Sequence, residues 1–155
     1  MTYPTIGAIA PDFSLPTHAN EVVTLAALKG APAVIYFYPK DDTPGCTTEA
    51  KDFTALGAAF AEAGARVFGV SRDSVASHGK FVEKHDLNVT LLSDENGAMC
   101  EAYGVWVEKS MYGKKYMGIE RATFLLDAEG KVTRIWSKVS VKDHAAEVLK
   151  AVEAL

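Results

Sequence analysis

A continuous apolar run near the first third of the chain constrains the fold most strongly. Residues 33–38 read Ala-Val-Ile-Tyr-Phe-Tyr between two prolines. Because the run does not alternate with polar residues, it predicts a strand buried on both faces in the sheet of an α/β protein. Apolar residues then recur at helical spacing over residues 48–60, with Glu49 and Asp52 expected in the first turn and Gly64 as the stop. The sequence therefore predicts a buried strand, a short loop and an amphipathic helix.

The rest of the chain alternates between strand and helix patterns. Short apolar runs predict further strands at residues 66–71, 89–93, 122–127 and 131–136. Helical spacing predicts helices at residues 74–85 and 97–103. This alternation is typical of an α/β sheet covered by helices. A chain of 155 residues has the usual size of one domain, so we expect residues 1–155 to form a single domain.

Local sequence signals predict the remaining turns, loop and helix after residue 107. The turn signal at residues 127–130 predicts an antiparallel hairpin. Residues 108–118 contain glycines and charges without a period, which predicts a surface loop. Ser140 and Asp143 form a capping-box pattern before a closing helix. The apolar face of that helix is expected to consist of Ala145, Val148, Leu149, Val152 and Leu155.

Composition excludes several classes of partner and compartment. A net charge of -4 gives no reason to expect binding to nucleic acid or to acidic lipid. The N-terminus lacks the basic and apolar regions of a signal peptide, and no stretch approaches the length of a membrane span. Cys46 and Cys100 are the only cysteines, which suits a reducing compartment and excludes a disulfide scaffold. We therefore expect a cytoplasmic protein that binds neither nucleic acid nor membrane.

Cys46 is the strongest candidate for a reactive group. It lies where the buried strand ends and a helix begins, so unpaired N–H groups and the helix dipole favour its thiolate over its thiol. Gly45 allows close approach of the backbone, and the prolines at 39 and 44 stiffen the loop. The hydroxyl of Thr43 can bind a small substrate beside the sulfur. The alternatives are a structural cysteine and a turn-stabilising threonine.

Other polar residues are interpreted as structural. Asp41 and Asp42 can form a carboxylate pair for acid–base chemistry, but two acids on a turn are expected to be solvated. The four histidines show no spacing typical of metal ligands and are expected to be ordinary surface residues. We therefore expect neither a metal nor another cofactor.

The segment around Cys46 resembles a known motif. The pattern Pro39-x-x-x-Thr43-x-x-Cys46 is similar to the active-site motif of the peroxiredoxins, and Tyr-Pro-Lys-Asp-Asp-Thr-Pro-Gly-Cys-Thr-Thr-Glu-Ala resembles the bacterioferritin comigratory protein or peroxiredoxin Q branch. The resemblance extends over most of the chain, through residues 7–15, 91–95, 102–106, 111–114 and 118–124.

This resemblance implies a fold, an activity and roles for residues. The fold would be thioredoxin-like, with a central mixed β-sheet flanked by helices. The activity would be the thiol-dependent reduction of hydrogen peroxide and organic hydroperoxides. Cys46 would be the peroxidatic cysteine, with Arg121 beside it; without the motif, Arg121 is a surface charge flanking a strand. Glu49 can hold that arginine through a charge-assisted bond, or can simply complement the helix dipole.

The chain departs from much of that branch in its second cysteine. Relatives often carry a resolving cysteine where this chain has Lys51, or on the next helix near Val82. Cys100 shares helical spacing with Met99 and Tyr103, so we expect it to be buried and inert, with a resolving role as the alternative. The expected cycle uses one cysteine, whose sulfenic acid is reduced by thioredoxin, glutaredoxin or a small thiol. The resemblance also implies a monomer.

Rival functions are weaker. A thiol–disulfide oxidoreductase needs a C-x-x-C pair, but position 49 is glutamate. A cysteine-dependent phosphatase needs an arginine in the loop that follows the cysteine, where this chain has acidic residues. A Cys–His hydrolase with His144 as base has no supporting pattern. A redox sensor or binding module, which would stop after about one equivalent of peroxide, is the remaining alternative.

Overall fold

A five-stranded mixed sheet forms the centre of the molecule. The computed structural model describes residues 2–155. The strand order is β5-β4-β3-β8-β9. The strands are β3 (Ala33–Phe37), β4 (Arg66–Ser71), β5 (Thr90–Ser93), β8 (Ala122–Leu126) and β9 (Val132–Trp136). β3, β4 and β5 are parallel, whereas β8 and β9 run antiparallel to their neighbours. This sheet confirms the predicted α/β class and the predicted hairpin of β8 and β9.

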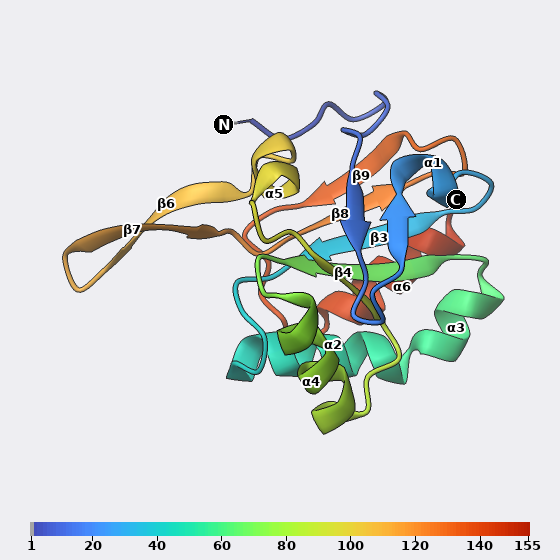
Figure 1. Cartoon of the computed structure of the whole chain (residues 1–155). Coiled ribbons are helices and arrows are strands. Elements are labelled where there is room, and N and C mark those ends of the chain that lie inside the picture. The colour runs from blue at the N-terminus through green and yellow to red at the C-terminus, as the bar shows by residue number, and fades with distance from the viewer. Residues whose placement is uncertain (1) are drawn as a thin grey trace.

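Helices cover one face of the sheet, and a smaller layer covers the other (Figure 1). The helical layer consists of α2 (Pro44–Ala55), α3 (Gly57–Glu62), α4 (Val75–His85) and α6 (His144–Glu153). The other layer consists of α1 (Leu25–Leu28), α5 (Ala98–Ala102) and the two-stranded sheet of β1 (Ser14–Pro16) and β2 (Val22–Thr24). Each layer shields apolar side chains of the sheet from water, which is the main driving force for this arrangement.

The two layers enclose two separate apolar cores. In β3, Val34 and Tyr36 belong to the core under the helical layer, whereas Ile35 and Phe37 belong to the opposite core. All four side chains are 0% exposed. Successive residues of a strand point to opposite faces, so a strand buried on both faces must be apolar at every position. This explains why the run at residues 33–38 is continuous.

The predicted boundaries around the central helix need correction. α2 begins at Pro44 rather than near residue 48, because proline at the first helical position starts the helix without losing a hydrogen bond. Glu49 and Asp52 therefore lie beyond the first turn. The single predicted helix is also divided at Leu56 into α2 and α3. Gly64 follows α3 with a positive φ of 81°, as expected of a stop signal.

The capping-box prediction is wrong. Asp143, not Ser140, precedes α6, and its side chain makes no capping hydrogen bond. Its φ of 61° lies in the left-handed region, which an aspartate tolerates better than most residues. Of the apolar face expected for the closing helix, Ala145, Val148 and Val152 are buried in α6 and Leu149 is half-buried, whereas Leu155 lies beyond the end of α6 and is exposed.

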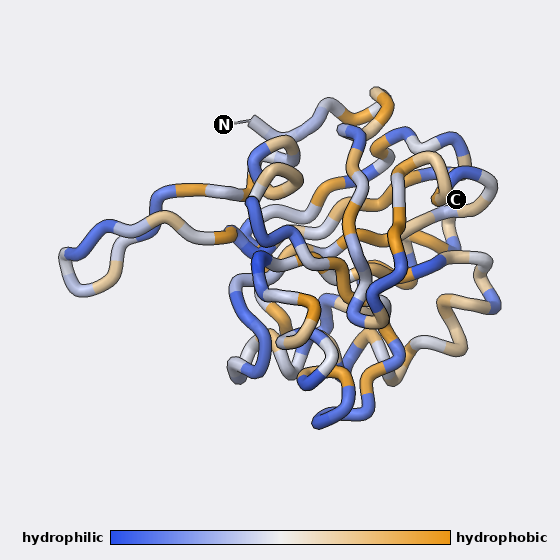
Figure 2. Tube along the Cα trace, viewed as in Figure 1, coloured by the Kyte–Doolittle hydropathy of each residue, from blue (hydrophilic) through white to orange (hydrophobic). Residues whose placement is uncertain are grey.

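The predicted surface loop is a β-hairpin. β6 (Trp106–Met111) and β7 (Lys114–Ile119) pair along their whole length and project from the body of the molecule (Figure 1). Tyr112 and Gly113 at the tip both have positive φ, as a two-residue hairpin turn with the twist of the strands requires. Hydrophilic and hydrophobic residues are interspersed along the hairpin (Figure 2). Because neither face of its outer half packs on a core, its sequence lacks the alternation that would have predicted strands.

Over residues 2–155, no helix is both long enough and apolar enough to span a bilayer.

Candidate active site

Sheet topology brings Cys46 and Arg121 together. Phe37, the last residue of β3, pairs with Ala122, the first residue of the antiparallel β8. The chain that leaves β3 toward Cys46 and the chain that enters β8 from Arg121 therefore meet at one edge of the sheet. The parallel strands β4 and β5 also end at this edge, which is where α/β proteins gather their functional groups.

Cys46 occupies the first turn of α2, two residues after Pro44. Its side chain is almost completely buried, with 2% exposed. The Nη2 of Arg121 donates a hydrogen bond to the sulfur over 3.2 Å. N–H groups in the first turn of a helix lack carbonyl partners within the helix and favour a negative charge. The sulfur thus lies beside a guanidinium at the start of a helix, and it is shielded from water.

Glu49 links this pair to the interior. Its Oε1 accepts a hydrogen bond of 2.6 Å from Nη1 of Arg121. Glu49 is 1% exposed, and its Oε2 has no hydrogen-bond partner in the described residues. Burial raises the pKa of Glu49 to about 7, although the charge of Arg121 and its hydrogen bond act in the opposite direction. A glutamate that only complemented the helix dipole would be exposed. The buried contact of Glu49 with Arg121 therefore favours the interpretation that Glu49 holds the arginine.

The charge of Arg121 is maintained by its two partners. Burial disfavours the guanidinium, but Glu49 and Cys46 outweigh burial and raise the pKa of Arg121 above its ordinary value. Gly45 makes the close contact possible, because a Cβ at this position would lie 3.3 Å from Nη2 of Arg121. A larger residue at 45 would therefore push the guanidinium away from the sulfur.

Thr43 lies three residues before Cys46, and its hydroxyl is hydrogen-bonded within the loop rather than to the sulfur. It is the residue that precedes α2, and its hydroxyl donates a hydrogen bond of 2.9 Å to the carbonyl oxygen of Lys40. The side chain is half-buried at the surface of the site. A rotation about its χ1 bond would release the hydroxyl to a bound substrate.

A cavity beside the loop involves the hairpin that the sequence did not predict. It has a volume of about 550 Å³ and is lined by Pro39, Lys40, Arg72, Glu95, Trp106, Lys109, Tyr116, Met117, Gly118 and Ile119. Lys109 is half-buried; burial and the charge of Arg121 lower its pKa, while Cys46 raises it. Neither this cavity nor another of about 580 Å³ is lined by Cys46 or Arg121 themselves. We associate the hairpin cavity with the site because Pro39 and Lys40 of the Cys46 loop line it and because the pKa of its Lys109 responds to the charges of Cys46 and Arg121.

The prediction that Asp41 is a solvated acid is wrong. Asp41 is 7% exposed and lies 2.7 Å from Nδ1 of His78, which is 0% exposed. Asp42 alone matches the prediction, because its side chain is 44% exposed. His144 is also buried, not a surface histidine. No local pattern signalled these contacts, since their partners lie on distant elements.

The expectation that the histidines do not cluster with metal-ligand residues is also incorrect. Potential ligand atoms of Asp41, Asp73 and His78 lie within 4.8 Å of one another. Each of the three side chains already takes part in hydrogen bonds inside the protein. The clustering is therefore explained by hydrogen bonding, and it gives no reason to assign a metal.

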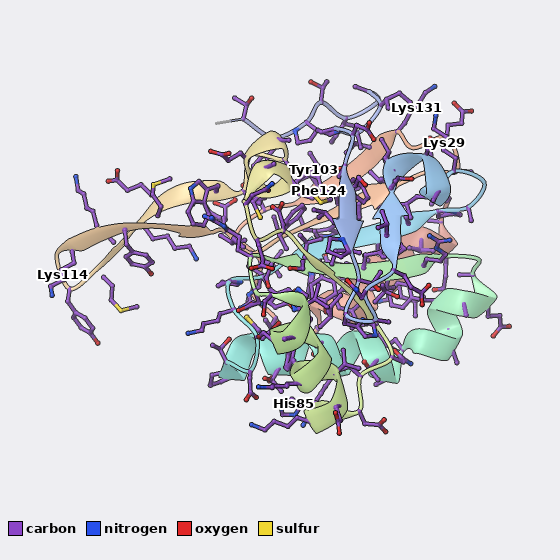
Figure 3. The ribbon with its side chains drawn as sticks, in the orientation of Figure 1. Lys29, His85, Tyr103, Lys114, Phe124 and Lys131 are labelled. Atoms are coloured by element: carbon purple, nitrogen blue, oxygen red, sulfur yellow. The ribbon has the colours of Figure 1, made fainter. Side chains whose placement is uncertain are left out.

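Cys100 belongs to the other core. It lies in α5, is 0% exposed, and its backbone N–H donates to Asp94 over 2.8 Å. Burial and the nearby carboxyl of Asp94 raise the pKa of its thiol well above the ordinary value. Tyr103, just after α5, packs edge-on against Phe124 with ring centroids 5.3 Å apart (Figure 3). The central sheet lies between the core of Cys100 and that of Cys46, so the structure does not bring the two cysteines together.

Comparisons with known proteins give a consistent picture. Residues 6–135 match the model of the AhpC/TSA family. The chain is 52% identical to the peroxiredoxin Bcp of Bacillus subtilis (strain 168), covering 96% of this chain and 94% of that protein. It is 51% identical to a putative peroxiredoxin Bcp of Coxiella burnetii, covering 93% and 95% of the two chains.

Solved structures agree with the sequence comparisons. A structure of Xanthomonas campestris peroxiredoxin Q has a TM-score of 0.88 and 51% identity, covering 92% of this chain and 90% of that one. With the same values, another describes the alkyl peroxide reduction activity of the bacterioferritin comigratory protein of that organism. A structure of Xylella fastidiosa PrxQ has a TM-score of 0.94 at 37% identity, covering 99% and 98% of the two chains.

Proposed function

Because the chain belongs to the AhpC/TSA family and is a peroxiredoxin of the Bcp type, a thiol-dependent peroxidase with a thioredoxin-like fold, we propose that Cys46 is its peroxidatic cysteine. One observation carries the proposal: Nη2 of Arg121 lies 3.2 Å from the sulfur at the start of α2. A cation and a helix N-terminus together stabilise the thiolate, which is the nucleophilic form of cysteine.

The reaction needs few groups. The Cys46 thiolate attacks one oxygen of the peroxide, an S–O bond forms and the O–O bond breaks. The departing oxygen takes a proton and leaves as water or alcohol, while the sulfur becomes a sulfenic acid. Charge develops on the departing oxygen, so donors that face it lower the barrier. We assign this role to Arg121, to the N–H of Cys46 and to the hydroxyl of Thr43 after it leaves Lys40.

Three further residues support this arrangement in our proposal. Glu49 holds the guanidinium of Arg121 through a hydrogen bond of 2.6 Å. Gly45 leaves room for the same guanidinium, since a Cβ would lie 3.3 Å from Nη2. Pro39 restricts the start of the loop and lines the cavity next to it. These residues position the groups that react.

An outside thiol completes the cycle in our proposal. The sulfenic acid of Cys46 condenses with a thiol to give a mixed disulfide and water, and a second thiol then releases Cys46. Thioredoxin, glutaredoxin and a small thiol can each supply these two electrons. The proposal is supported by the position of Cys100, which belongs to the opposite core and is 0% exposed. Lys51 and Val82, where relatives often carry a second cysteine, have no thiol.

Both hydrogen peroxide and organic hydroperoxides are proposed substrates. The cavity beside the loop combines Trp106, Tyr116 and Met117 with the half-buried Lys109, so it offers apolar surface to an organic group. The relative from Xanthomonas campestris is described in terms of alkyl peroxide reduction. A monomer in the cytoplasm is a further proposal, supported for the compartment by two free thiols.

A turnover assay tests the proposed function. Purified protein is mixed with excess peroxide and excess dithiothreitol, and peroxide consumed per chain is counted. We expect many equivalents per chain in the parent and about background consumption in Cys46→Ser. After one equivalent of peroxide and a sulfenic acid reagent, intact mass should show one label per chain, and peptide mapping should place it on Cys46. Consumption that stops near one equivalent, or full activity in Cys46→Ser, would contradict the proposal.

A further inference from the structure

A buried hydrogen-bond network lies behind the loop that carries Cys46. Asp41, in that loop, accepts hydrogen bonds from the hydroxyls of Tyr38 over 2.6 Å and of Ser77 over 2.8 Å. The same carboxyl lies 2.7 Å from Nδ1 of His78. Ser77 and His78 belong to α4, so the network joins the loop to a neighbouring helix.

The hydrogen-bond partners restrict the protonation of this network. Nε2 of His78 lies 2.9 Å from the carbonyl oxygen of Leu92, which can only accept, so Nε2 carries a proton. The carboxyl of Asp41 and Nδ1 of His78 therefore share a single proton across 2.7 Å. Next to the hydrogen bond that Ser77 donates, Asp41 and His78 make one hydrogen bond between the loop and α4, whichever atom carries that proton. It is shielded from water, because His78 is 0% exposed and Asp41 is 7% exposed.

The position of this pair matters for access to the sulfur. Cys46 is 2% exposed and lies in the first turn of α2, five residues after Asp41. A peroxide is small enough to reach a nearly buried sulfur, but a thiol on another protein must bring its own sulfur into line with Cys46. The loop and the first turn of α2 must move for that contact. Any group that ties the loop to α4 opposes the movement.

We propose that Asp41 and His78 are positioning residues whose buried hydrogen bond sets how the Cys46 sulfenic acid is partitioned between reduction and further oxidation. The inference rests on the proposed function of Cys46. In the reductive branch, the sulfenic acid and a thiol give a mixed disulfide and water. In the oxidative branch, the sulfenate attacks a second peroxide, breaks its O–O bond and becomes a sulfinic acid, with release of water or alcohol. When the loop at Asp41 is closed, further oxidation is favoured; when it is open, reduction by a thiol is favoured.

A second pair provides an internal control. Asp42, the next residue, lies 2.8 Å from Nε2 of His85 and 2.7 Å from Nζ of Lys84, both on α4. His85 and Lys84 thus join the same loop to the same helix, but the carboxyl of Asp42 is 44% exposed. Exposed ion pairs contribute little, because water competes for both partners. His85 lies at the outer end of α4, at the rim of the molecule (Figure 3).

The experiment compares His78→Phe with His85→Phe, which is the same change on the same helix. Each variant is cycled with peroxide and a thioredoxin system, which supplies a protein thiol, and the sulfinic acid formed per turnover is measured by intact mass. Stopped-flow mixing gives the rate of sulfenic acid reduction separately from that of the first oxidation. In His78→Phe we expect about tenfold less sulfinic acid per turnover and faster reduction, as for the loss of one buried hydrogen bond. In His85→Phe both quantities should stay within about twofold of the parent.

Several outcomes would overturn the inference. A residue with only a structural role would lower global stability without changing the partition ratio, so a folded His78→Phe with the parental ratio refutes it. If His78→Phe does not fold, Ser77→Ala removes one donor to Asp41 and is tested for the same ratio and for amide exchange over residues 41–50. Unchanged exchange and an unchanged ratio in Ser77→Ala also refute it. If the parent forms no sulfenic acid on Cys46, the proposed function fails before the variants are compared.

Discussion

The two cysteines differ in their neighbours far more than in their burial. Cys46 and Cys100 are 2% and 0% exposed, and each belongs to one of the two cores on either side of the sheet. Cys46 accepts a hydrogen bond from Arg121, whereas the charged neighbour that affects Cys100 most is the carboxyl of Asp94, which raises its pKa. Burial alone opposes a thiolate at either position. The nearby charge therefore distinguishes a candidate nucleophile from a core residue.

Position relative to the sheet explains this difference. Cys46 lies at the edge where β3 ends and β8 begins, so side chains from separate segments converge on it. Cys100 lies in α5 over the middle of a core that contains Phe37, Tyr103 and Phe124. In that core the N–H of Cys100 donates to Asp94, which also accepts from the N–H of Met99, and the carbonyl oxygen of Cys100 accepts from Val105. The edge of the sheet thus supplies Cys46 with a cation, whereas the charged neighbour of Cys100 is a carboxyl.

Replacement of each cysteine by serine gives the largest expected contrast. A serine hydroxyl at neutral pH is not ionised and is a poor nucleophile toward peroxide, so Cys46→Ser should lose more than about 1000-fold in turnover. Cys100→Ser should keep turnover within about threefold of the parent, because its position lies across the sheet from the site. Peroxide consumption with dithiothreitol measures both. A Cys46–Cys100 disulfide found by peptide mapping after oxidation would break the comparison.

Removal of the positive charge of Arg121 beside Cys46 should have the next largest effect on activity. Arg121→Gln keeps a donor near the sulfur but removes the positive charge and the ion pair with Glu49. We expect the second-order rate constant with hydrogen peroxide to fall about 100-fold, as when one preorganised donor to a developing charge is lost. The matched control is Arg134→Gln, since Arg134 is a half-exposed arginine paired with Glu147 on another part of the surface. Equal losses in the two variants would refute a specific role for Arg121.

Most of the site around Cys46 was predictable because the sequence signals for it are local. Burial on both faces makes β3 a continuous apolar run, and Cys46 follows it in a short loop stiffened by prolines, although α2 begins at Pro44, earlier than its apolar spacing predicted. Arg121 was different, because by composition it is only a charge before a strand. Its assignment depended on the resemblance to peroxiredoxins, and the antiparallel pairing of β3 with β8 gives the physical reason for its position.

The missed features depend on partners far away in sequence. Asp41 is buried because His78, 37 residues later, approaches it from α4. Lys109 reaches the site because β6 and β7 pair with each other, although their outer halves have too little burial to produce an alternating pattern. Hydrogen-bond networks of this kind leave no periodic trace in the sequence. Sequence reasoning therefore found the nucleophile but not the residues that hold its loop.

The burial of Glu49 beside Arg121 should make the free energy of unfolding depend on pH. The ordinary pKa of a glutamate is 4.5, and burial raises that of Glu49 to about 7 in the folded chain. Between these pH values the folded chain keeps a proton that the unfolded chain releases, so the free energy of unfolding falls as pH rises. The fall amounts to about 3 kcal/mol, and it should be absent in Glu49→Gln. Denaturant unfolding at pH 5 and at pH 7.5 measures it.

A difference measurement isolates this contribution. Burial lowers the pKa of His144 to about 4, so His144 contributes the opposite slope between about pH 4 and its ordinary value of 6.5. Both proteins share that slope, and it cancels when Glu49→Gln is compared with the parent. Glu129→Gln is the control, because Glu129 is exposed at the surface. An identical pH profile in the parent and in Glu49→Gln would mean that Glu49 is ionised at both pH values.

The smallest effect concerns stability at the second cysteine. Cys100→Ser places a hydroxyl in an apolar core, where desolvation of an imperfectly bonded polar group costs about 1–3 kcal/mol. Cys46→Ser should cost less, because the hydroxyl of a serine can accept the hydrogen bond that Arg121 donates to the sulfur. Urea unfolding at pH 7.5 compares the two variants with the parent. If Cys46→Ser were the more destabilised, the charge of Arg121 would be compensated mainly by the thiolate of Cys46. The two cores would then differ in stability because only the Cys46 site contains a cysteine that is ion-paired.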